Sequence, residues 1–128
     1  MAGRLTELVV DCHDPERLAA FWCAVLDFEV LERAEDRAEI GSRTHGGAVR
    51  ARQAPPTVVF IRVPEEKKLK SRLHLDVSPV DRTTEAEATR LEVLGATRVD
   101  VGQGPDRTWT VTADPEGNEF RVRRSLAP

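Results

Sequence analysis

The sequence of 128 residues has only two cysteines, Cys12 and Cys23. They form no CxxC pair and have no histidines at zinc-ligand spacing, so a cysteine-based metal centre and a disulfide framework are both excluded. At this length, a single domain buries enough surface to fold without a disulfide or a metal. We therefore expect two reduced thiols in the core of a cytoplasmic protein.

Long apolar runs and an excess of charge of one sign are also missing. No segment reaches the length needed to cross a membrane, and residues 1–11 contain no basic region that leads into an apolar stretch. The net charge of −3 is small and the signs are mixed, which argues against nucleic acid as a partner. The sequence contains no GxSxG, Walker or dinucleotide-binding motif, so it gives no support for a hydrolase, a kinase or a dehydrogenase. These absences argue against nucleic acid and membranes as partners.

The clearest positive feature is an internal repeat. A strand followed by Asp14 and a helix recurs as a strand followed by Asp81 and another helix, and the two aspartates lie 67 residues apart. Glu7 and His74 have the same spacing. The two residues therefore occupy equivalent positions on equivalent strands, where a pseudo-twofold arrangement can bring them to one cavity.

The first half begins with a strand over residues 5–12. Asp14 is a good N-cap and Pro15 suits the first helical position, so a helix is expected over residues 15–26. Its apolar stripe, which includes Trp22, should pack on a sheet. Further strands are expected at 28–33, 38–42 and 57–63, and residues 43–56 form the longest irregular loop.

The second half repeats this order with a strand at 72–77. Thr84 and Glu87 have capping-box spacing, which predicts a helix from about Thr84 to a stop at Gly95. Strands are expected at 97–101, 108–112 and 119–123. Each half is thus a βαβββ unit, which predicts a single α+β domain over residues 1–128 made of module one (1–64), a linker (65–71) and module two (72–128).

Alternation along the strands predicts which side chains share a face. In module two, Leu73, Leu75 and Val77 should face the helix, whereas His74 and Asp76 should project from the opposite face. On the last strand Phe120 and Val122 should be buried. This arrangement sends Glu119, Arg121 and Arg123 to the face opposite the helix, and Glu7 occupies the corresponding face of module one.

The chain resembles the vicinal oxygen chelate superfamily, in particular its glyoxalase-like and bleomycin-resistance-like members. Four segments that span nearly the whole chain carry the resemblance: Glu7…Asp14-Pro15…Phe21-Trp22, Arg72-Leu73-His74-Leu75-Asp76, Leu94-Gly95-Ala96 and Asp114-Pro115-Glu116-Gly117-Asn118-Glu119-Phe120. The last of these is the most specific, although its first five residues are also ordinary turn chemistry. The resemblance implies two βαβββ modules whose curved mixed sheets surround a central cleft, and it implies a homodimer.

The resemblance also implies a set of metal ligands. Metal-using members take one ligand from each of the first, fourth, fifth and eighth strands, positions that correspond here to Glu7, Phe60 or Ile61, His74 and Glu119. The fourth-strand position is apolar, so at most Glu7, His74 and Glu119 remain for a divalent ion such as Zn, Mn, Fe or Ni.

Two functions are compatible with these residues. A metal-dependent lyase or isomerase would use the ion as a Lewis acid, with Glu7 and Glu119 also acting in catalysis. The alternative is a metal-free protein that sequesters a small-molecule ligand, as bleomycin-resistance relatives do. In that case the ligand-binding candidates Trp109, Asp76 and Arg121 carry more weight, with Trp109 as a flat wall and Arg121 as a cation near an anionic group.

Overall fold

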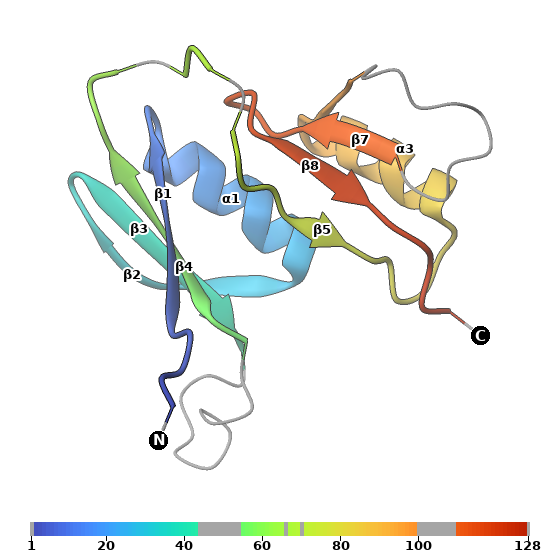
Figure 1. Cartoon of the computed structure of the whole chain (residues 1–128), viewed down its shortest axis with the longest axis horizontal. Coiled ribbons are helices and arrows are strands. Elements are labelled where there is room, and N and C mark those ends of the chain that lie inside the picture. Colours follow the sequence, from blue (N-terminus) through green and yellow to red (C-terminus); the bar gives the residue numbers. More distant parts are fainter. Residues whose placement is uncertain (1, 44–54, 66, 70, 100–109, 128) are drawn as a thin grey trace. The chain divides into compact units, whose positions relative to one another are not determined.

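The computed structural model describes residues 2–43, 55–65, 67–69, 71–99 and 110–127. The chain divides into two compact units, Met1–Glu66 and Lys67–Pro128, and each is described by itself (Figure 1). The division falls within residues 65–71, which the sequence suggested as a linker. The assignment of both units to one domain stays a prediction.

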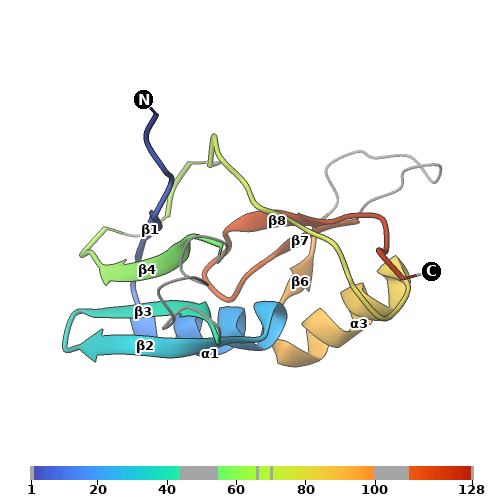
Figure 2. The same ribbon diagram turned by 90° about the horizontal axis from the view of Figure 1, so that it is seen from below.

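The first unit is a four-stranded mixed sheet with one helix. Its elements are β1 (Glu7–Cys12), α1 (Pro15–Leu26), β2 (Phe28–Ala34), β3 (Arg37–Ser42) and β4 (Thr57–Arg62). The strand order is β1-β4-β3-β2. β1 runs parallel to β4, while β3 is antiparallel to both β4 and β2 (Figure 2).

The second unit has the same order of elements and the same sheet topology. It consists of β5 (Asp76–Val77), α3 (Thr84–Leu94), β6 (Thr97–Arg98), β7 (Thr110–Ala113) and β8 (Glu119–Val122). The strand order is β5-β8-β7-β6, with β5 parallel to β8. Neither sheet is closed on itself. The predicted α+β fold of two βαβββ modules is confirmed.

Helix α1 has the predicted bounds because its two ends are well capped. Asp14 accepts a hydrogen bond from the backbone N–H of Arg17 at 3.1 Å, and Pro15 occupies the first helical position. The helix ends at Asp27, which has the left-handed conformation with φ 55°. An aspartate there replaces the glycine more often found at this position.

Helix α3 begins at Thr84, as expected, but its N-cap lies one residue earlier than predicted. Thr83, rather than Thr84, is the N-cap, and its hydroxyl accepts a hydrogen bond from the N–H of Ala86 at 3.0 Å. Thr84 instead donates a hydrogen bond to the carbonyl of Arg123 at 2.8 Å. The capping box expected between Thr84 and Glu87 is therefore wrong. The predicted stop at Gly95 is confirmed, with φ 118°.

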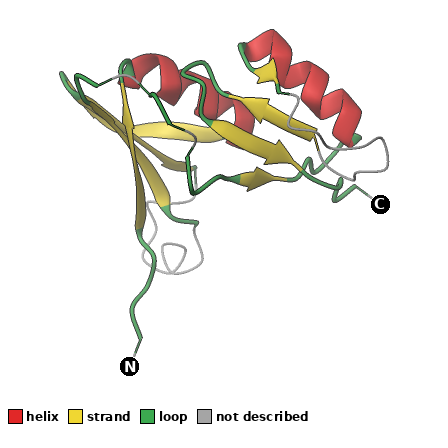
Figure 3. Ribbon diagram, turned by 45° about the horizontal axis from the view of Figure 1, so that its top comes forward, coloured by secondary structure: helices red, strands yellow, loops and turns green. Residues whose placement is uncertain are grey.

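Each helix packs on the sheet of its own unit (Figure 3). In the first unit α1 lies on β2, β3 and β4, and in the second α3 lies on β6, β7 and β8. The fully buried side chains include Leu18, Ile40 and Phe60 in the first unit and Leu91, Phe120 and Val122 in the second. Trp22 is 4% exposed and contacts Phe21 edge to face, so its predicted core position is confirmed.

The expected strand at 72–77 is wrong in its length. Only Asp76–Val77 forms β5, and Leu73, which was expected to face the helix, is 83% exposed. The chain still follows β8 over this short stretch, because the carbonyls of Leu75 and Val77 accept hydrogen bonds from the backbone N–H groups of Arg121 and Arg123.

Neither Cys12 nor Cys23 forms a disulfide. Cys12 is buried at the end of β1, and Cys23 is half-buried in α1. Burial raises the pKa of the Cys23 thiol, which keeps it protonated at neutral pH.

Among the described residues, neither helix is long and apolar enough to cross a membrane.

Candidate ligand-binding face

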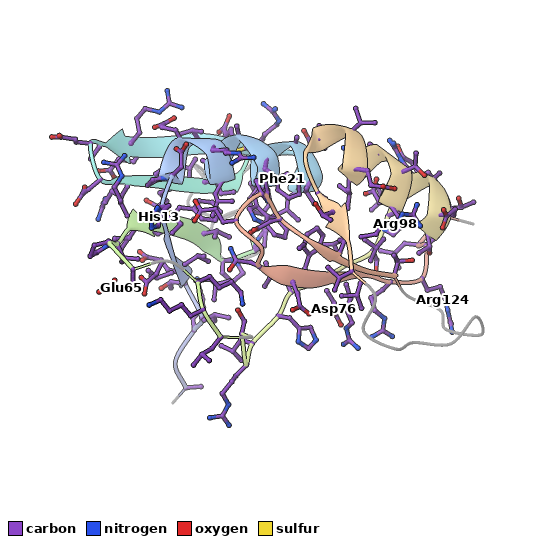
Figure 4. All side chains as sticks on the ribbon, turned by 90° about the horizontal axis from the view of Figure 1, so that it is seen from above. His13, Phe21, Glu65, Asp76, Arg98 and Arg124 are labelled. Carbon is purple, nitrogen blue, oxygen red and sulfur yellow. The ribbon has the colours of Figure 1, made fainter. Side chains whose placement is uncertain are left out.

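The sheet of the second unit has a buried face and a polar face. Phe120 and Val122 on β8 are buried, and α3 packs on this strand. Because side chains alternate along a strand, Glu119 and Arg121 project from the opposite side, where both are half-buried. Asp76 lies on that side as well, away from α3 (Figure 4). We call His74, Asp76, Glu119, Arg121 and Arg123 the polar face of the second sheet.

The centre of the polar face is an ion pair between neighbouring strands. Asp76 on β5 is the register partner of Arg121 on β8, so the two side chains start side by side. Arg121 donates from Nε to Oδ1 and from Nη2 to Oδ2 of Asp76, both at 2.7 Å. Arg123 also contacts Oδ2, from Nη1 at 3.4 Å. This two-pronged geometry fixes the plane of the Arg121 guanidinium.

The ion pair keeps both groups charged. The hydrogen bonds from Arg121 hold the pKa of the Asp76 carboxyl below its usual value. The same hydrogen bonds raise the pKa of the Arg121 guanidinium. A permanent carboxylate and a permanent guanidinium therefore occupy this face at neutral pH.

His74 lies beside the ion pair, in the extended segment before β5. Its Nε2 is 3.7 Å from Oδ1 of Asp76, which is too long for a hydrogen bond but close enough for an electrostatic interaction when the imidazole is protonated. The side chain is 46% exposed. His74, Asp76 and Arg121, three residues singled out from the sequence, are thus brought together.

The tight turn between β7 and β8 determines the position of Glu119. Asp114, 4% exposed, accepts hydrogen bonds from the backbone N–H groups of Glu116 and Asn118 at 2.9 and 3.0 Å. The Asn118 side-chain amide binds the same carboxylate, and Gly117 has φ 83°. The motif from Asp114 to Asn118 is therefore a turn, as its composition indicated, and it sets where Glu119 begins β8.

The face of the first sheet opposite α1 has different chemistry. Glu7 is exposed at the start of β1 and is the register partner of Thr57 on β4. Thr57, 2% exposed, donates a hydrogen bond from Oγ1 to Oε2 of Glu39 at 2.8 Å. This sheet therefore places acidic side chains beside Val59 and Ile61, with alternation putting Phe60 on the helix side.

The donor groups that the structure describes do not fit a divalent ion within the second unit. Over the described ranges, no group of three or more His, Cys, Asp or Glu side chains is placed to hold one. Asp76, the carboxylate nearest His74, is bound by Arg121. Glu7 belongs to the other unit. The set of Glu7, His74 and Glu119 stays a prediction.

Two features considered at the outset fall outside the described residues. Trp109, the candidate flat wall for a ligand, lies in the gap at 100–109, and most of the loop at 43–56 lies in the gap at 44–54.

Sequence reasoning placed Arg123 on the polar face but gave it no role. The structure adds it to the Asp76 ion pair. It also pairs Thr57 with Glu39, which the sequence did not suggest. Strand alternation signals the face of Arg123, whereas its contact with Asp76 depends on the register between β5 and β8.

Comparison with protein families gives one match, to the model described as a glyoxalase-like domain, over residues 7–123. The chain belongs to the glyoxalase-like domain family. The resemblance to the vicinal oxygen chelate superfamily is thereby confirmed. No curated protein matches the chain.

Solved structures with the glyoxalase-like fold are similar over most of this chain. A glyoxalase/bleomycin resistance protein/dioxygenase family enzyme from Burkholderia phytofirmans PsJN has a TM-score of 0.68 at 18% identity, covering 94% of this chain and 97% of that one. The fosfomycin resistance protein FosX from Mesorhizobium loti has a TM-score of 0.64 at 17% identity, covering 96% and 92%.

A third similar structure carries ligands. It is a mutant of FosX from Listeria monocytogenes, in complex with Mn(II) and 1S,2S-dihydroxypropylphosphonic acid. Its TM-score is 0.69 at 8% identity, covering 98% of this chain and 91% of that one. At these identities the three likenesses support a shared fold.

Proposed function

We propose that this glyoxalase-like domain is a small-molecule-binding protein that works without a metal and holds its ligand on the polar face of the second sheet. The observation that carries the proposal is the two-pronged ion pair between Asp76 and Arg121 beside His74. It is a set of rigid, half-exposed polar groups backed by a packed sheet and helix, and such preformed polar groups orient ligands in binding sites.

The ion pair also argues against a metal at this place. A divalent ion beside His74 would need carboxylate ligands, and the nearest carboxylate, Asp76, already neutralises Arg121. Breaking that pair would leave a guanidinium close to a dication, and like charges at such distances repel. Ligand sequestration of the bleomycin-resistance type needs no metal and fits these groups.

A metal-dependent lyase or isomerase is the second candidate. One observation favours it: if the register of Asp76 with Arg121 is continued by two residues, His74 lies opposite Glu119. These two would bind the ion, and Glu7 would complete the set or act as a base. The FosX protein from Listeria monocytogenes has been seen with Mn(II). A bound ion would supply Lewis-acid polarisation of a substrate oxygen.

Metal content and ligand binding together separate the two candidates. The protein is purified from medium supplemented with Mn, Fe, Zn and Ni, and its metal content is measured before and after incubation with each ion. A library of small fluorinated molecules is then screened by fluorine NMR, with and without a chelator. We expect less than stoichiometric metal and a set of binders that the chelator leaves unchanged.

Substitutions localise the binding. Arg121→Gln and His74→Ala should weaken the binders found in the screen, while Arg17→Gln, on an exposed position of α1, should not. Stoichiometric metal that is lost in both His74→Ala and Glu119→Ala would reject the metal-free proposal and favour the lyase or isomerase. The expected homodimer and cytoplasmic location stay predictions.

A further inference from the structure

Positive charge gathers at the Arg123 end of the polar face of the second sheet, where two guanidiniums contact one carboxylate. Arg121 contacts Oδ2 of Asp76 at 2.7 Å, and Arg123 contacts the same oxygen at 3.4 Å. Glu119 is the other carboxylate of this face. It lies two residues before Arg121, about 7 Å away along the strand, so the positive charge is greatest at the Arg123 end.

The cluster of Asp76, Arg121 and Arg123 differs in its charge count from the other ion-pair clusters described in the second unit. Arg98 lies beside α3 and is shared between two carboxylates, Glu85 and Glu92 (Figure 4). A second cluster pairs Arg82 and Arg90 with Asp81 and Glu87, so its charges balance. Those clusters contain at least as many carboxylates as guanidiniums, whereas two guanidiniums contact the single carboxylate of Asp76.

The cationic groups are held in place and remain accessible. Arg121 is fixed by two hydrogen bonds to Asp76, and Asp76 is fixed in turn by its position on β5. The side chains of Arg121 and Arg123 are 29% and 41% exposed. A guanidinium held in a fixed plane loses little further freedom when it binds an oxyanion, and guanidinium geometry matches two-oxygen anions.

We propose that the ligand of this face carries an anionic oxygen group, a carboxylate or a phosphonate, and that Arg123, together with Arg121, recognises it. The proposal rests on the proposed function, since it names the chemical class of the ligand for the same site. Asp76 has a positioning role, because it orients Arg121 and keeps the two guanidiniums together. His74 and Glu119 lie toward the other end and would meet the uncharged part of the ligand.

Three probes that share one ring test the proposal: benzoate, phenylphosphonate and the neutral benzamide. Each is titrated into the ¹⁵N-labelled full chain, and binding is followed at the arginine Nε–H signals and by calorimetry at two salt concentrations. We expect at least one of the anions to bind about tenfold or more tightly than benzamide, to shift the Arg121 and Arg123 signals, and to weaken at high salt. The stronger of the two anions identifies the group.

Matched variants separate recognition from folding. Arg123→Gln should weaken binding of the anion about tenfold, while the urea midpoint changes little. Arg121→Lys keeps the positive charge but loses the two-pronged guanidinium geometry. It should therefore weaken anion binding less than Arg121→Gln does. Arg124→Gln removes the same charge from the adjacent exposed residue and should leave binding nearly unchanged.

Three results would overturn the proposal. One is equal binding of benzamide and the anions. Another is anion binding that Arg121→Gln and Arg123→Gln leave intact. The third is the absence of binding by either anion up to its solubility limit. If neutral members of the fluorinated library still bind in that last case, the proposed function survives and only the anionic class is rejected.

Discussion

The two units have the same order of strands but hold their sheets together differently. In the first unit β1 pairs with β4 over six residue positions, from Glu7 to Cys12. In the second, the corresponding pairing of β5 with β8 covers two. Side-chain hydrogen bonds in the second unit, from Arg121 to Asp76 and from Thr84 to the carbonyl of Arg123, add to this short ladder. A duplicated topology can thus be stabilised by backbone pairing in one copy and by side chains in the other.

The faces of the two sheets opposite their helices also differ. The first sheet combines Glu7 and Glu39 with apolar Val59 and Ile61, whereas the second places Arg121 and Arg123 around Asp76. The residues that tie β5 to β8 are therefore the ones we propose to meet the ligand. If these residues bind the ligand as we propose, stability and binding depend on the same side chains in the second unit.

The largest effect is expected at Asp114, whose buried carboxylate binds two backbone N–H groups and the Asn118 amide. Asp114→Ala leaves these donors unsatisfied and should cost about 3 kcal/mol of unfolding free energy. Urea denaturation measures the cost, and hydrogen exchange should show the loss of protection concentrated in the second unit. Equal loss of protection in both units would show that the effect of Asp114 is not local to the β7–β8 turn.

The C-cap residues of the two helices allow matched substitutions in the two units. Gly95 has φ 118°, a conformation that side chains rarely adopt, so Gly95→Ala should destabilise the second unit by about 1 to 2 kcal/mol. At the matching position, Asp27 has φ 55°, and Asp27→Gly should stabilise the first unit by about 0.5 kcal/mol. Thermal unfolding of both variants checks the signs. A loss of stability in Asp27→Gly would mean that the aspartate side chain contributes more than its strain costs.

The N-caps should behave alike in the two units. Asp14→Ala and Thr83→Ala each remove one hydrogen bond to the first helical turn and should each cost about 1 kcal/mol. Chemical denaturation of the two variants, with Thr84→Ala as a comparison, measures the costs. If Thr84→Ala mimics a lost cap and Thr83→Ala is silent, the position of the α3 N-cap is wrong.

Local signals in the sequence predicted the elements whose ends are chemically marked. Asp14 followed by Pro15 gave the start of α1, and Gly95 gave the end of α3. Two adjacent threonines, Thr83 and Thr84, both suit an N-cap. The choice between them was settled by a tertiary hydrogen bond from Thr84 to Arg123, which no local pattern contains.

The candidate site was only partly predictable for the same physical reason. Strand alternation assigned Asp76, Arg121 and Arg123 to one face. Their mutual contacts depend on a pairing between residues 45 positions apart, and that register is set by the whole sheet. The length of β5 was overestimated because its apolar alternation looks like a longer strand, whereas Leu73 is exposed in the structure.

The smallest expected effect is the pH dependence of the Asp76 ion pair. Because Arg121 lowers the pKa of Asp76 in the folded state, the pair stabilises the protein above the unfolded pKa of about 3.9 and loses its contribution as the pH falls through the lower folded value. For a pair that is about one-third exposed, Asp76→Asn should cost about 0.5 to 1 kcal/mol at pH 7, with less at high salt. Urea unfolding of the wild type and the variant from pH 7 to pH 2 should show the difference shrinking below about pH 4. Asp81→Asn, which removes a carboxylate paired with Arg82 at a more exposed position, should change stability less. A difference for Asp76→Asn that persists unchanged at pH 2 would assign its effect to lost packing rather than to the charge that links β5 to β8.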